Sequence, residues 1–360
     1  MDCCEFISDG DHLPPPKSID GVPFITISNI NGQNKISFEN TMFVPKSYYD
    51  GLNETKKARK GDILYSVVGS FGKPVYVDFD MPMVFQRHIA ILRPQSDVNG
   101  KFLYYTMLNP QFYRMVDKLT IGCSQRTVTL DALRNIEINL PDKNVQDKMV
   151  RILSLLDEKI DTNSNVNDNL ERQVQLIFDY LFPDVSAGNK HMGDFIIPKR
   201  GKPLLSKNAV PGNVPVIAGG LEPSIYHNVA NTVAPVVTIS SSGANAGFVN
   251  IWGVPIWSSD SSYIDSEMSQ HVYFWYAYLK RHQNNIYNIQ TGSAQPHIYP
   301  SHISSLPITD LDYKKIEKYT KIVSPIFSTI TQNHVESQHL QSLRNWLLPM
   351  LMNGQATINN

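Results

Sequence analysis

The stretch DKNVQDKMVRILSLLDEKIDTNSNVNDNLERQVQLIFDYLF, residues 142–182, is the longest amphipathic run in the chain. Its apolar side chains recur at steps of three and four residues, apart from one six-residue step across Asn163, as expected for one face of a helix. Those side chains are Val145, Met149, Ile152, Leu156, Ile160, Val166, Leu170, Val174, Ile177 and Leu181. Pro141 precedes the run and Pro183 follows it, which predicts one helix of about 40 residues, or about 60 Å.

The same pattern occurs a second time, 170 positions further along. Identical residues at this offset are Ile152 and Ile322, Ser154 and Ser324, Ile160 and Ile330, Asn163 and Asn333, Leu170 and Leu340, and Leu181 and Leu351. The offset continues upstream, where Gln125 falls on Gln295 and Ile138 on Ile308. This repetition indicates an internal duplication, so we predict two globular units that are each followed by a long helix.

The middle of each predicted helix is polar, at residues 161–169 and 331–339. If the two helices pair in opposite directions, these polar centres face each other. Asn163 and Asn333 would then supply buried amides that fix the register of the pair. The alternative is that both helices fray at their polar centres, and the sequence does not decide between the two.

Composition limits the classes of protein to consider. The chain has 360 residues, of which 42% are hydrophobic and 18% charged, which is typical of a soluble protein of two or three domains. It contains no apolar run of the ~20 residues that a membrane span needs, and its first residues resemble no secretion signal. Three cysteines cannot build a disulfide framework or a four-ligand zinc site, so a reducing cytoplasm is expected. His12, His88 and His297 are not spaced as metal ligands, and we expect no metal or cofactor in this chain.

The formal net charge of −1 does not by itself indicate a nucleic-acid binder. The charge is distributed unevenly, because residues 142–185 carry five basic and nine acidic side chains whereas residues 186–305 carry seven and five. The first long helix is therefore acidic and suits a protein partner, and DNA contacts would come from local basic clusters.

The globular parts are rich in short β-type runs. In the first globular part, these runs are residues 22–30, 61–68, 74–77 and 84–92. Short helices are predicted in the same part at 102–109 and 112–118. In the second globular part, the β-type runs are residues 213–218, 233–240, 248–252 and 255–257. A glycine-bracketed loop at 69–73 has its counterpart at 240–247. The loop at 69–73 lacks the GxxxxGK[ST] sequence of a nucleotide-binding P-loop and is not followed by a helix. The fold class is therefore α+β, with mixed, largely antiparallel sheets and short helices.

With these segments in place, the chain resembles the specificity subunits of type I restriction-modification systems over essentially its whole length. The first unit carries DGDHLPPP at 9–16, GVPFI at 21–25, GDILYSVVGSFGKPVYV at 61–77, VFQRHIAILRP at 84–94 and SQRTVTLDALRNIEINLP at 124–141. The second carries NVPVIAGG at 213–220, SSSGANAGFV at 240–249 and GSAQPHIYPSHISSLPI at 292–308. The order of these fragments, which occurs twice, carries the resemblance.

The resemblance implies a division into target-recognition domain 1 at 1–141, spacer helix 1 at 142–185, target-recognition domain 2 at 186–305 and spacer helix 2 at 306–356. Each domain would read one half of a bipartite asymmetric DNA site, and the two helices would form an antiparallel coiled coil. The implied partners are double-stranded DNA, two methyltransferase subunits and restriction subunits, with S-adenosylmethionine held by the methyltransferase. Because the chain begins almost at the DGDH motif, we expect the first domain to lack an edge strand or to be covered by another segment.

Base reading needs bidentate side chains, Arg or Lys for guanine and Asn or Gln for adenine. The candidates in loops are Lys73, Gln86, Arg87, Gln125 and Arg126 in the first unit and Ser241, Asn245, Gln295 and His297 in the second. Gln86 and Arg87 could instead brace a loop, and Gln125 and Gln295, which match across the repeat, favour a shared structural or phosphate role. Phosphate contacts orient the protein without discriminating between sequences, and the candidates for them are Lys56, Lys57, Arg59, Lys199, Arg200 and Lys202. Lys280 and Arg281 form a further basic pair.

Two other functions make different demands on the sequence. An amino-methyltransferase would need a [DNS]PP[YF] tetrapeptide and a glycine-rich cofactor loop, and the chain has neither. A two-headed coiled-coil adaptor without a DNA role should show apolar patches on its globular units, whereas a DNA reader should gather Lys, Arg, Asn and Gln on one face of each.

Overall fold

The computed structural model describes residues 3–122, 125–292 and 295–356, and within these ranges the chain forms two compact units. Unit 1 comprises residues 1–159 and 339–360, and unit 2 comprises residues 160–338. Each unit therefore combines one globular part with segments of both long helices, which is a different division from the four segments that the sequence indicates. Cys123, Ser124, Ser293 and Ala294, which belong to or adjoin the repeated motifs quoted above, lie outside the described residues.

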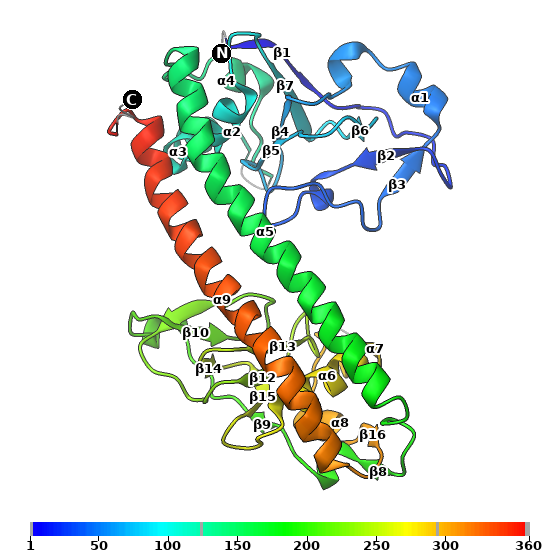
Figure 1. Ribbon diagram of the computed structural model, residues 1–360. Coiled ribbons are helices and arrows are strands. Elements are labelled where there is room, and N and C mark those ends of the chain that lie inside the picture. The colour runs from blue at the N-terminus through cyan, green and yellow to red at the C-terminus, as the bar shows by residue number, and fades with distance from the viewer. Residues whose placement is uncertain (1–2, 123–124, 293–294, 357–360) are drawn as a thin grey trace. The chain divides into compact units, whose positions relative to one another are not determined.

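Unit 1 contains two sheets and four short helices (Figure 1). Its strands are β1 (Cys4–Asp9), β2 (Val22–Ile25), β3 (Met42–Val44), β4 (Ile63–Ser66), β5 (Pro74–Tyr76), β6 (Val84–Phe85) and β7 (Ile89–Pro94). Its short helices are α1 (Lys46–Asp50), α2 (Gly100–Leu108), α3 (Pro110–Lys118) and α4 (Leu130–Arg134). The first sheet has the antiparallel order β1-β7-β4-β5, and the second has the order β3-β2-β6.

The central strands of unit 1 are buried on both faces, which explains why their sequences read as continuous apolar runs. Alternate residues point to opposite sides of the sheet. Ile63 and Tyr65 of β4 pack in a cluster with Leu103 and Phe112 of the short helices. Leu64 packs on the other side in a cluster with Phe85. The sheet thus lies between the helices and the second sheet.

The expectation that the first unit lacks an edge strand is wrong. Residues Cys4–Asp9 form β1, which pairs antiparallel with β7 from Cys4 opposite Pro94 to Asp9 opposite Ala90. The few residues before the DGDH motif are enough for this strand, because a strand of six residues spans the length of β7.

Unit 2 repeats this arrangement in a shorter form. Its strands are β8 (Lys190–His191), β9 (Lys199–Arg200), β10 (Val214–Ile217), β11 (Ile225–His227), β12 (Val236–Ser240), β13 (Val249–Trp252), β14 (Trp257–Ser258), β15 (Ser261–Asp265) and β16 (Pro307–Ile308). Its short helices are α6 (Val272–Arg281), α7 (Gln283–Asn288) and α8 (Pro300–Ser304). Strands β16 and β8 form a separate antiparallel pair.

The strand order confirms the predicted duplication. The order β9-β15-β12-β13 in unit 2 matches β1-β7-β4-β5 in unit 1, and β11-β10-β14 matches β3-β2-β6. The directions match as well, because β2 pairs parallel with β6 and β10 pairs parallel with β14, whereas all other pairs of these sheets are antiparallel.

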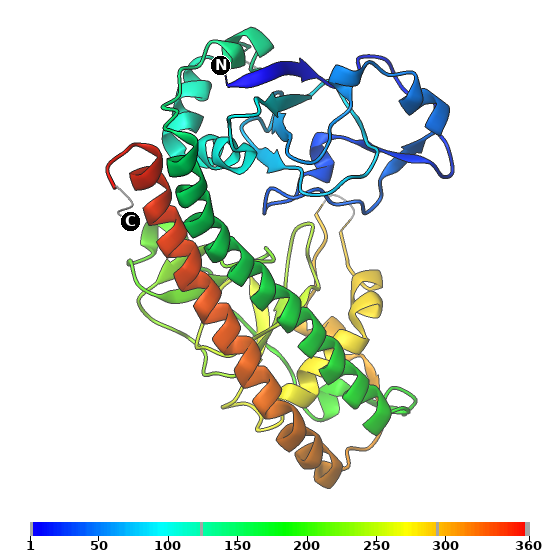
Figure 2. The same cartoon turned by 45° about the horizontal axis from the view of Figure 1, so that its top comes forward.

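Helix α6 is the main element that sequence reasoning did not identify. Its sequence VYFWYAYLKR is rich in aromatic residues, which favour strands locally. Phe274 packs against Phe178 of the first long helix and against Phe182, which directly follows this helix, with ring centroids 5.6 and 5.2 Å apart. Tertiary burial of this face therefore decides the helical state, and α6 lies against the long helices in unit 2 (Figure 2).

The long helices are α5 (Lys143–Leu181) and α9 (Tyr313–Met352), and they run antiparallel within each unit. In unit 1, Arg344 donates to the Asp157 carboxylate at 2.8 Å, and Asp157 also accepts from the Tyr105 hydroxyl at 2.7 Å. In unit 2, Asn167 of α5 lies opposite Ile330 of α9. Further along α5 in the same unit, Phe178 lies against Tyr319 of α9, with ring centroids 5.7 Å apart. Higher numbers in α5 thus meet lower numbers in α9 within unit 2, which confirms the antiparallel pair.

The polar centres of the two helices are folded, so the alternative in which both fray is wrong. Asn163 and Asn167 are only 3% and 4% exposed, whereas Val166, which the periodicity assigned to the apolar face, is 40% exposed. The helix buries these amides because each finds hydrogen-bond partners on the facing helix.

Candidate nucleic-acid interface

Each unit presents a pair of loops at one end of its four-stranded sheet. In unit 1 the loop between β4 and β5 bonds to a second loop, with Gly69 N donating to Arg126 O at 3.0 Å and Val128 N donating to Val67 O at 2.8 Å. Both loops need glycine, because Gly69 and Gly122 have φ values of 67° and 90°. The loop that was predicted at 69–73 thus forms half of a hydrogen-bonded pair.

Unit 2 has the same loop pair, formed by the loop between β12 and β13 and the segment that precedes α8. Gly243 N donates to Pro296 O at 3.1 Å, and Ile298 N donates to Ser241 O at 2.9 Å. Gly243 and Gly292 again have positive φ values, 82° and 90°. The two units therefore share one loop framework, as the sequence predicted for residues 69–73 and 240–247.

A hollow of about 350 Å³ in unit 1 is lined by two of the predicted base readers, Arg87 and Gln125. Its lining residues are Asp9, His12, Val67, Val68, Arg87, His88, Gln125, Thr127, Val128, Thr129 and Leu130. The Nε2 atom of His12 lies 2.5 Å from the Asp9 carboxylate. Burial, together with the neighbouring Arg87 charge, lowers the pKa of His88. Arg87 and Gln125 therefore lie around one cavity, whereas Gln86, Lys73 and Arg126 do not line it.

Arg126 is held by its own unit. Its guanidinium donates to Thr120 Oγ1 and to the Asp117 carbonyl, pairs with the Asp117 carboxylate at 2.7 Å, and lies 5.2 Å from the Phe71 ring centroid. These contacts fix the second loop of unit 1. Lys73 is half-buried and forms no side-chain hydrogen bond or ion pair with any described residue.

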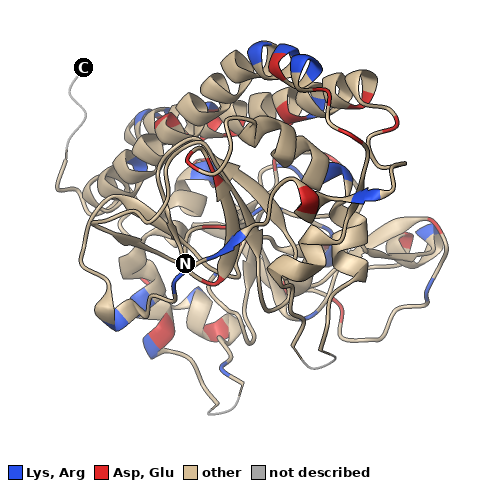
Figure 3. Cartoon of the chain, turned by 90° about the horizontal axis from the view of Figure 1, so that it is seen from below, with Lys and Arg blue, Asp and Glu red and all other residues tan. Residues whose placement is uncertain are grey.

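The basic run before β4 is paired with acidic neighbours. Lys56 lies 3.5 Å from Asp11, Lys57 donates to Glu54 at 2.7 Å, and Arg59 lies 3.8 Å from Glu5. Burial alone would raise the pKa of Asp11, but the Tyr48 hydroxyl, the Leu13 amide and the Lys56 charge together hold this pKa below its usual value. Figure 3 accordingly shows Lys and Arg scattered among Asp and Glu instead of forming one continuous stripe.

In unit 2, Lys199 and Arg200 form the edge strand β9, and Lys202 follows it in an exposed position. Arg200 donates to the Asp260 carboxylate at 2.6 Å. Asn245 is half-buried at the turn of the first loop, and Gln295 and His297 lie in the second loop. His297 bridges to both Ser242 and Thr291 through the backbone.

Two of the sequence interpretations need correction. Ser241 is only 1% exposed and its hydroxyl has no hydrogen-bond partner in the described structure, so this side chain faces the core and cannot touch a base. Arg281 donates to the carbonyls of Phe182 and Pro183 at 2.8 and 2.7 Å and so caps the end of α5. Burial lowers the pKa of its neighbour Lys280. Lys280 and Arg281 are therefore structural and not a further basic pair for DNA.

Asn163 and Asn333 both lie between the long helices in unit 2. The Asn163 amide donates to the Glu336 carboxylate at 2.8 Å and to Ser337 at 3.2 Å. The Asn333 amide donates to the Asn167 side-chain oxygen at 2.8 Å. Asn167 completes the network, although the periodicity of the sequence had not singled it out. Control of helix register by these amides remains a prediction.

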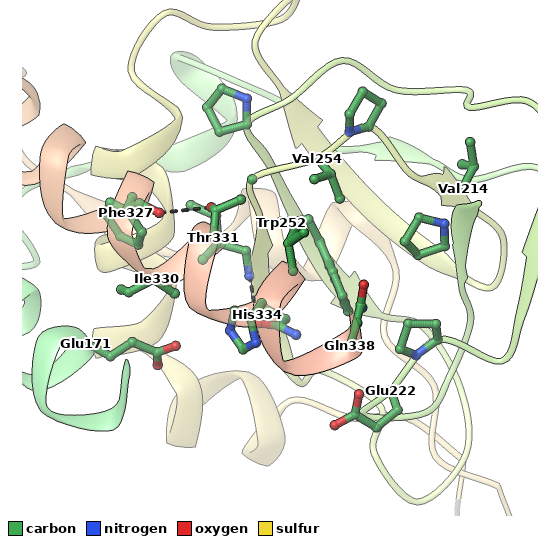
Figure 4. Close-up of a pocket in the computed structure, with 18 of the residues that line it drawn as sticks. Glu171, Val214, Glu222, Trp252, Val254, Phe327, Ile330, Thr331, His334 and Gln338 are labelled. Carbon is green, nitrogen blue, oxygen red and sulfur yellow. Dashed lines mark hydrogen bonds between the residues drawn. The ribbon is translucent and has the colours of Figure 1, made fainter. Parts of the chain in front are cut away.

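A cavity of about 490 Å³ lies elsewhere in unit 2 and has a different character. It is a mainly apolar seam between α9 and the strands around Trp252, with Phe327, Ile330 and Thr331 on the helix side (Figure 4). None of the predicted DNA-contacting residues lines it. We therefore assign the candidate interface to the loop pairs and not to this cavity.

Sequence reasoning missed Asp9, Ser242 and Asp260 as polar residues beside the loop pairs. Asp260 accepts hydrogen bonds from both Arg200 and the Ser242 hydroxyl. The signal that could have identified Asp9 is the DGDH motif itself, in which Asp9 ends the edge strand. Within the described ranges, no three His, Cys, Asp or Glu side chains are placed to share a metal ion, and no described helix could cross a membrane.

Comparison with known proteins places these features in context. Residues 13–172 match the family described as the type I restriction modification DNA specificity domain. The chain is similar to the type I restriction enzyme HindI specificity subunit of Haemophilus influenzae, with 28% identity over 50% of this chain and 41% of that protein. It is also similar to the MjaVIII specificity subunit of Methanocaldococcus jannaschii, with 27% identity over 45% of this chain and 39% of that protein. The aligned part thus spans about two-fifths of each of these relatives.

A solved structure shares the fold over nearly the whole chain. The crystal structure of a type I restriction-modification system S subunit from M. genitalium superposes with a TM-score of 0.59 and 18% identity, covering 96% of this chain and 93% of that one.

Proposed function

The chain belongs to the family of type I restriction-modification specificity subunits, and from this premise we propose that it selects the DNA site for an adenine-N6 methyltransferase and restriction complex. The observation that carries the proposal is the loop framework that occurs once in each unit. Two similar frames with different side chains suit a bipartite asymmetric site, in which each unit reads one half.

The proposed division of labour follows from the chemistry of the exposed groups. Lys199 and Lys202 lie on and beside an edge strand, and they suit the phosphate backbone, which positions a protein without specifying bases. The polar residues of the loop pairs, such as Arg87 and Asn245, have the donors and acceptors that base edges require.

The partners in this proposal are two methyltransferase subunits and the restriction subunits. Support comes from the acidic first helix and from large apolar side chains that remain exposed on the long helices, such as Leu155, Leu176, Tyr180 and Trp346. We propose that the chain carries out no chemistry. S-adenosylmethionine would be held by the methyltransferase, which would receive the target adenine flipped out of the duplex.

The decisive experiment is co-expression of the chain with its methyltransferase subunit, followed by sequencing of methylated adenines in the host genome. We expect methylation at one split motif with a spacer of constant length, and none when the chain is omitted. Methylation without a motif, or a motif that does not depend on the chain, would contradict the proposal.

A salt titration separates this function from that of a protein adaptor without a DNA role. Because phosphate contacts release counterions, the affinity of the assembled complex for duplex DNA should fall steeply as salt is raised from about 50 to 200 mM. An adaptor would show no measurable duplex binding at either concentration.

A further inference from the structure

The two units are equivalent residue by residue where the edge strand meets the loop pair. Gly10 N donates to Ile89 O at 3.0 Å, and Gly201 N donates to Ser261 O at 2.8 Å. A Cβ atom on either glycine would lie within 2.6 Å of backbone oxygen atoms, so both units need glycine at this point. The residue before each glycine, Asp9 in unit 1 and Arg200 in unit 2, therefore occupies the same place. We call this place the strand-end position.

A second equivalence lies opposite the strand-end position. Val67 N donates to His88 O at 2.9 Å in unit 1, and Ser241 N donates to Asp260 O at 3.1 Å in unit 2. His88 and Asp260 therefore correspond, although unit 2 has one residue fewer between its parallel strand and β15.

The side chains at these equivalent places have exchanged charge. Unit 1 has an acid at the strand-end position, and its Asp9 carboxylate contacts His12 at 2.5 Å. Unit 2 has a base there, and the Arg200 guanidinium contacts Asp260 at 2.6 Å. The Asp9 side chain is 27% exposed and the Arg200 side chain is 42% exposed, so both reach solvent. In unit 1 this position borders the hollow that also contains Arg87 and Gln125.

This exchange is inconsistent with a shared phosphate contact. A phosphate would repel the Asp9 carboxylate in unit 1, and in unit 2 it would lie close to Asp260 beside Arg200. A base edge suits both residues, because a carboxylate accepts from the amino group of cytosine and a guanidinium donates to O6 and N7 of guanine. In unit 2, Asp260 fixes one side of the guanidinium and thus its orientation.

We propose that the strand-end position determines sequence specificity, with Asp9 reading a base that offers an amino group and Arg200 reading a guanine. Asp260 is a positioning residue that orients Arg200. This inference rests on the proposed function and reassigns Arg200, which the sequence alone placed among the phosphate contacts.

The test uses the full chain in complex with its methyltransferase and a library of random-sequence duplexes, with the bound fraction sequenced. For Arg200→Lys, which keeps the charge but not the planar fork, we expect overall affinity to persist. The preference for guanine at one position of one half-site should fall by roughly five- to a hundredfold. Asp9→Asn should alter one position of the other half-site, and Asp260→Asn should weaken the same guanine preference as Arg200→Lys.

Lys207→Ala in unit 2 and Glu5→Gln in unit 1 are the controls, because each changes an exposed charge that the inference does not use. Both should leave the motif unchanged. If Arg200→Lys and Asp9→Asn keep the thermal unfolding temperature and also keep the wild-type motif, or if they weaken binding to all sequences alike, the inference is wrong. Absence of any motif for the wild-type complex would instead overturn the proposed function.

Discussion

At the scale of single residues, backbone hydrogen bonds fix the loop pairs, and the side chains around them are free to differ between units. Gly69 and Gly243 donate to the second loop in the same way, although the residues that follow them have unrelated side chains. Asn245 lies in the tight turn that closes with Phe248 N donating to its carbonyl at 3.0 Å. The side-chain amide of Asn245 can therefore be changed without removing this backbone hydrogen bond.

Asn245→Ala should change the half-site that unit 2 reads. An asparagine amide forms two hydrogen bonds with adenine, and a good bidentate pair contributes about 1–3 kcal/mol of discrimination. We expect one adenine in the methylated motif to become degenerate, as measured by sequencing methylated adenines. The matched control is a substitution of the exposed neighbour, Ala244→Ser, which should leave the motif intact. An unchanged motif for Asn245→Ala would show that the loop assignment is wrong.

His282 predicts a dependence of stability on pH. This side chain is 3% exposed, and burial lowers its pKa from the ordinary value of 6.5, although its hydrogen bond to the Tyr278 carbonyl acts in the opposite direction. As the pH falls through 6.5, the unfolded chain takes up a proton that the folded chain resists, so stability is present above this pH and is lost below it.

The unfolding temperature of the chain should therefore decrease as the pH is lowered from about 7.5 to 5.5. Thermal unfolding at constant ionic strength measures this decrease. His282→Gln should reduce this slope. His12→Gln is the control, because that side chain is exposed. An equal slope in wild type and His282→Gln would contradict the assignment of the effect to this residue.

At the scale of elements, the long helices are joined by side chains that differ in kind along their length. In unit 1 the contact is apolar, with Leu153 of α5 packed with Leu348 of α9, and it ends at the Asp157–Arg344 pair. In unit 2 the contact between α5 and α9 includes the asparagine network around Asn163 and the aromatic cluster of Phe178 and Tyr319. Buried asparagines that bond across the helix pair suit a register signal, because any sliding of the helices would leave them without partners.

A double-mutant cycle on Asn167 and Asn333 tests this network, because their side chains bond directly at 2.8 Å. Each single change to alanine leaves a partner amide unsatisfied and should cost about 1–3 kcal/mol in the free energy of unfolding. The double variant should cost less than the sum, with a coupling of about 1 kcal/mol. Asn169→Ala, on the exposed side of the same helix, should have little effect. Strict additivity would indicate that the two amides act independently.

Gly253 tests the packing of the β13–β14 turn on α9. An added Cβ atom would lie 1.8 Å from the Thr331 hydroxyl, so Gly253→Ala should displace the turn and cost about 1–3 kcal/mol, as measured by chemical unfolding. Thr331→Ala in the same chain should recover part of the loss, because it removes the two closest atoms. Gly220→Ala is the matched control, with its nearest neighbour at 3.5 Å. Equal stability of the two glycine variants would show that the turn can move freely.

At the scale of the whole molecule, the proposed DNA contacts fall into two classes that contribute differently to binding. Phosphate contacts supply affinity and depend on salt, whereas base contacts supply discrimination. Lys199 and Lys202 belong to the first class in our proposal, and the strand-end and loop residues belong to the second.

The double variant Lys199→Ala and Lys202→Ala should weaken binding to all duplexes alike. The slope of the logarithm of affinity against the logarithm of salt concentration should decrease by about 1 for each phosphate contact that is lost. Binding to cognate and non-cognate duplexes by the assembled complex measures both effects. Lys207→Ala, which removes another exposed charge of unit 2, is the control. A change in the preferred motif would move these lysines into the class of base contacts.

The sequence by itself determined the duplication, the two long helices and the matching loops at 69–73 and 240–247, because these depend on periodicity and on the order of short motifs. It could not place α6, whose aromatic residues favour a strand locally and become helical only through burial against α5 and α9. Nor could it show that Ser241 faces the core or that Arg281 caps a helix.

Tertiary structure alone decided which residues stand at equivalent places in the two units. Asp9 and Arg200 are 191 positions apart in the chain, and this separation differs from the offset of 170 that relates the long helices. The connections inside the two units differ in length, so a constant offset fails there. Only the hydrogen-bond register of β1 on β7 and of β9 on β15 aligns the two residues, because strand pairing depends on distance in space and not on distance along the sequence.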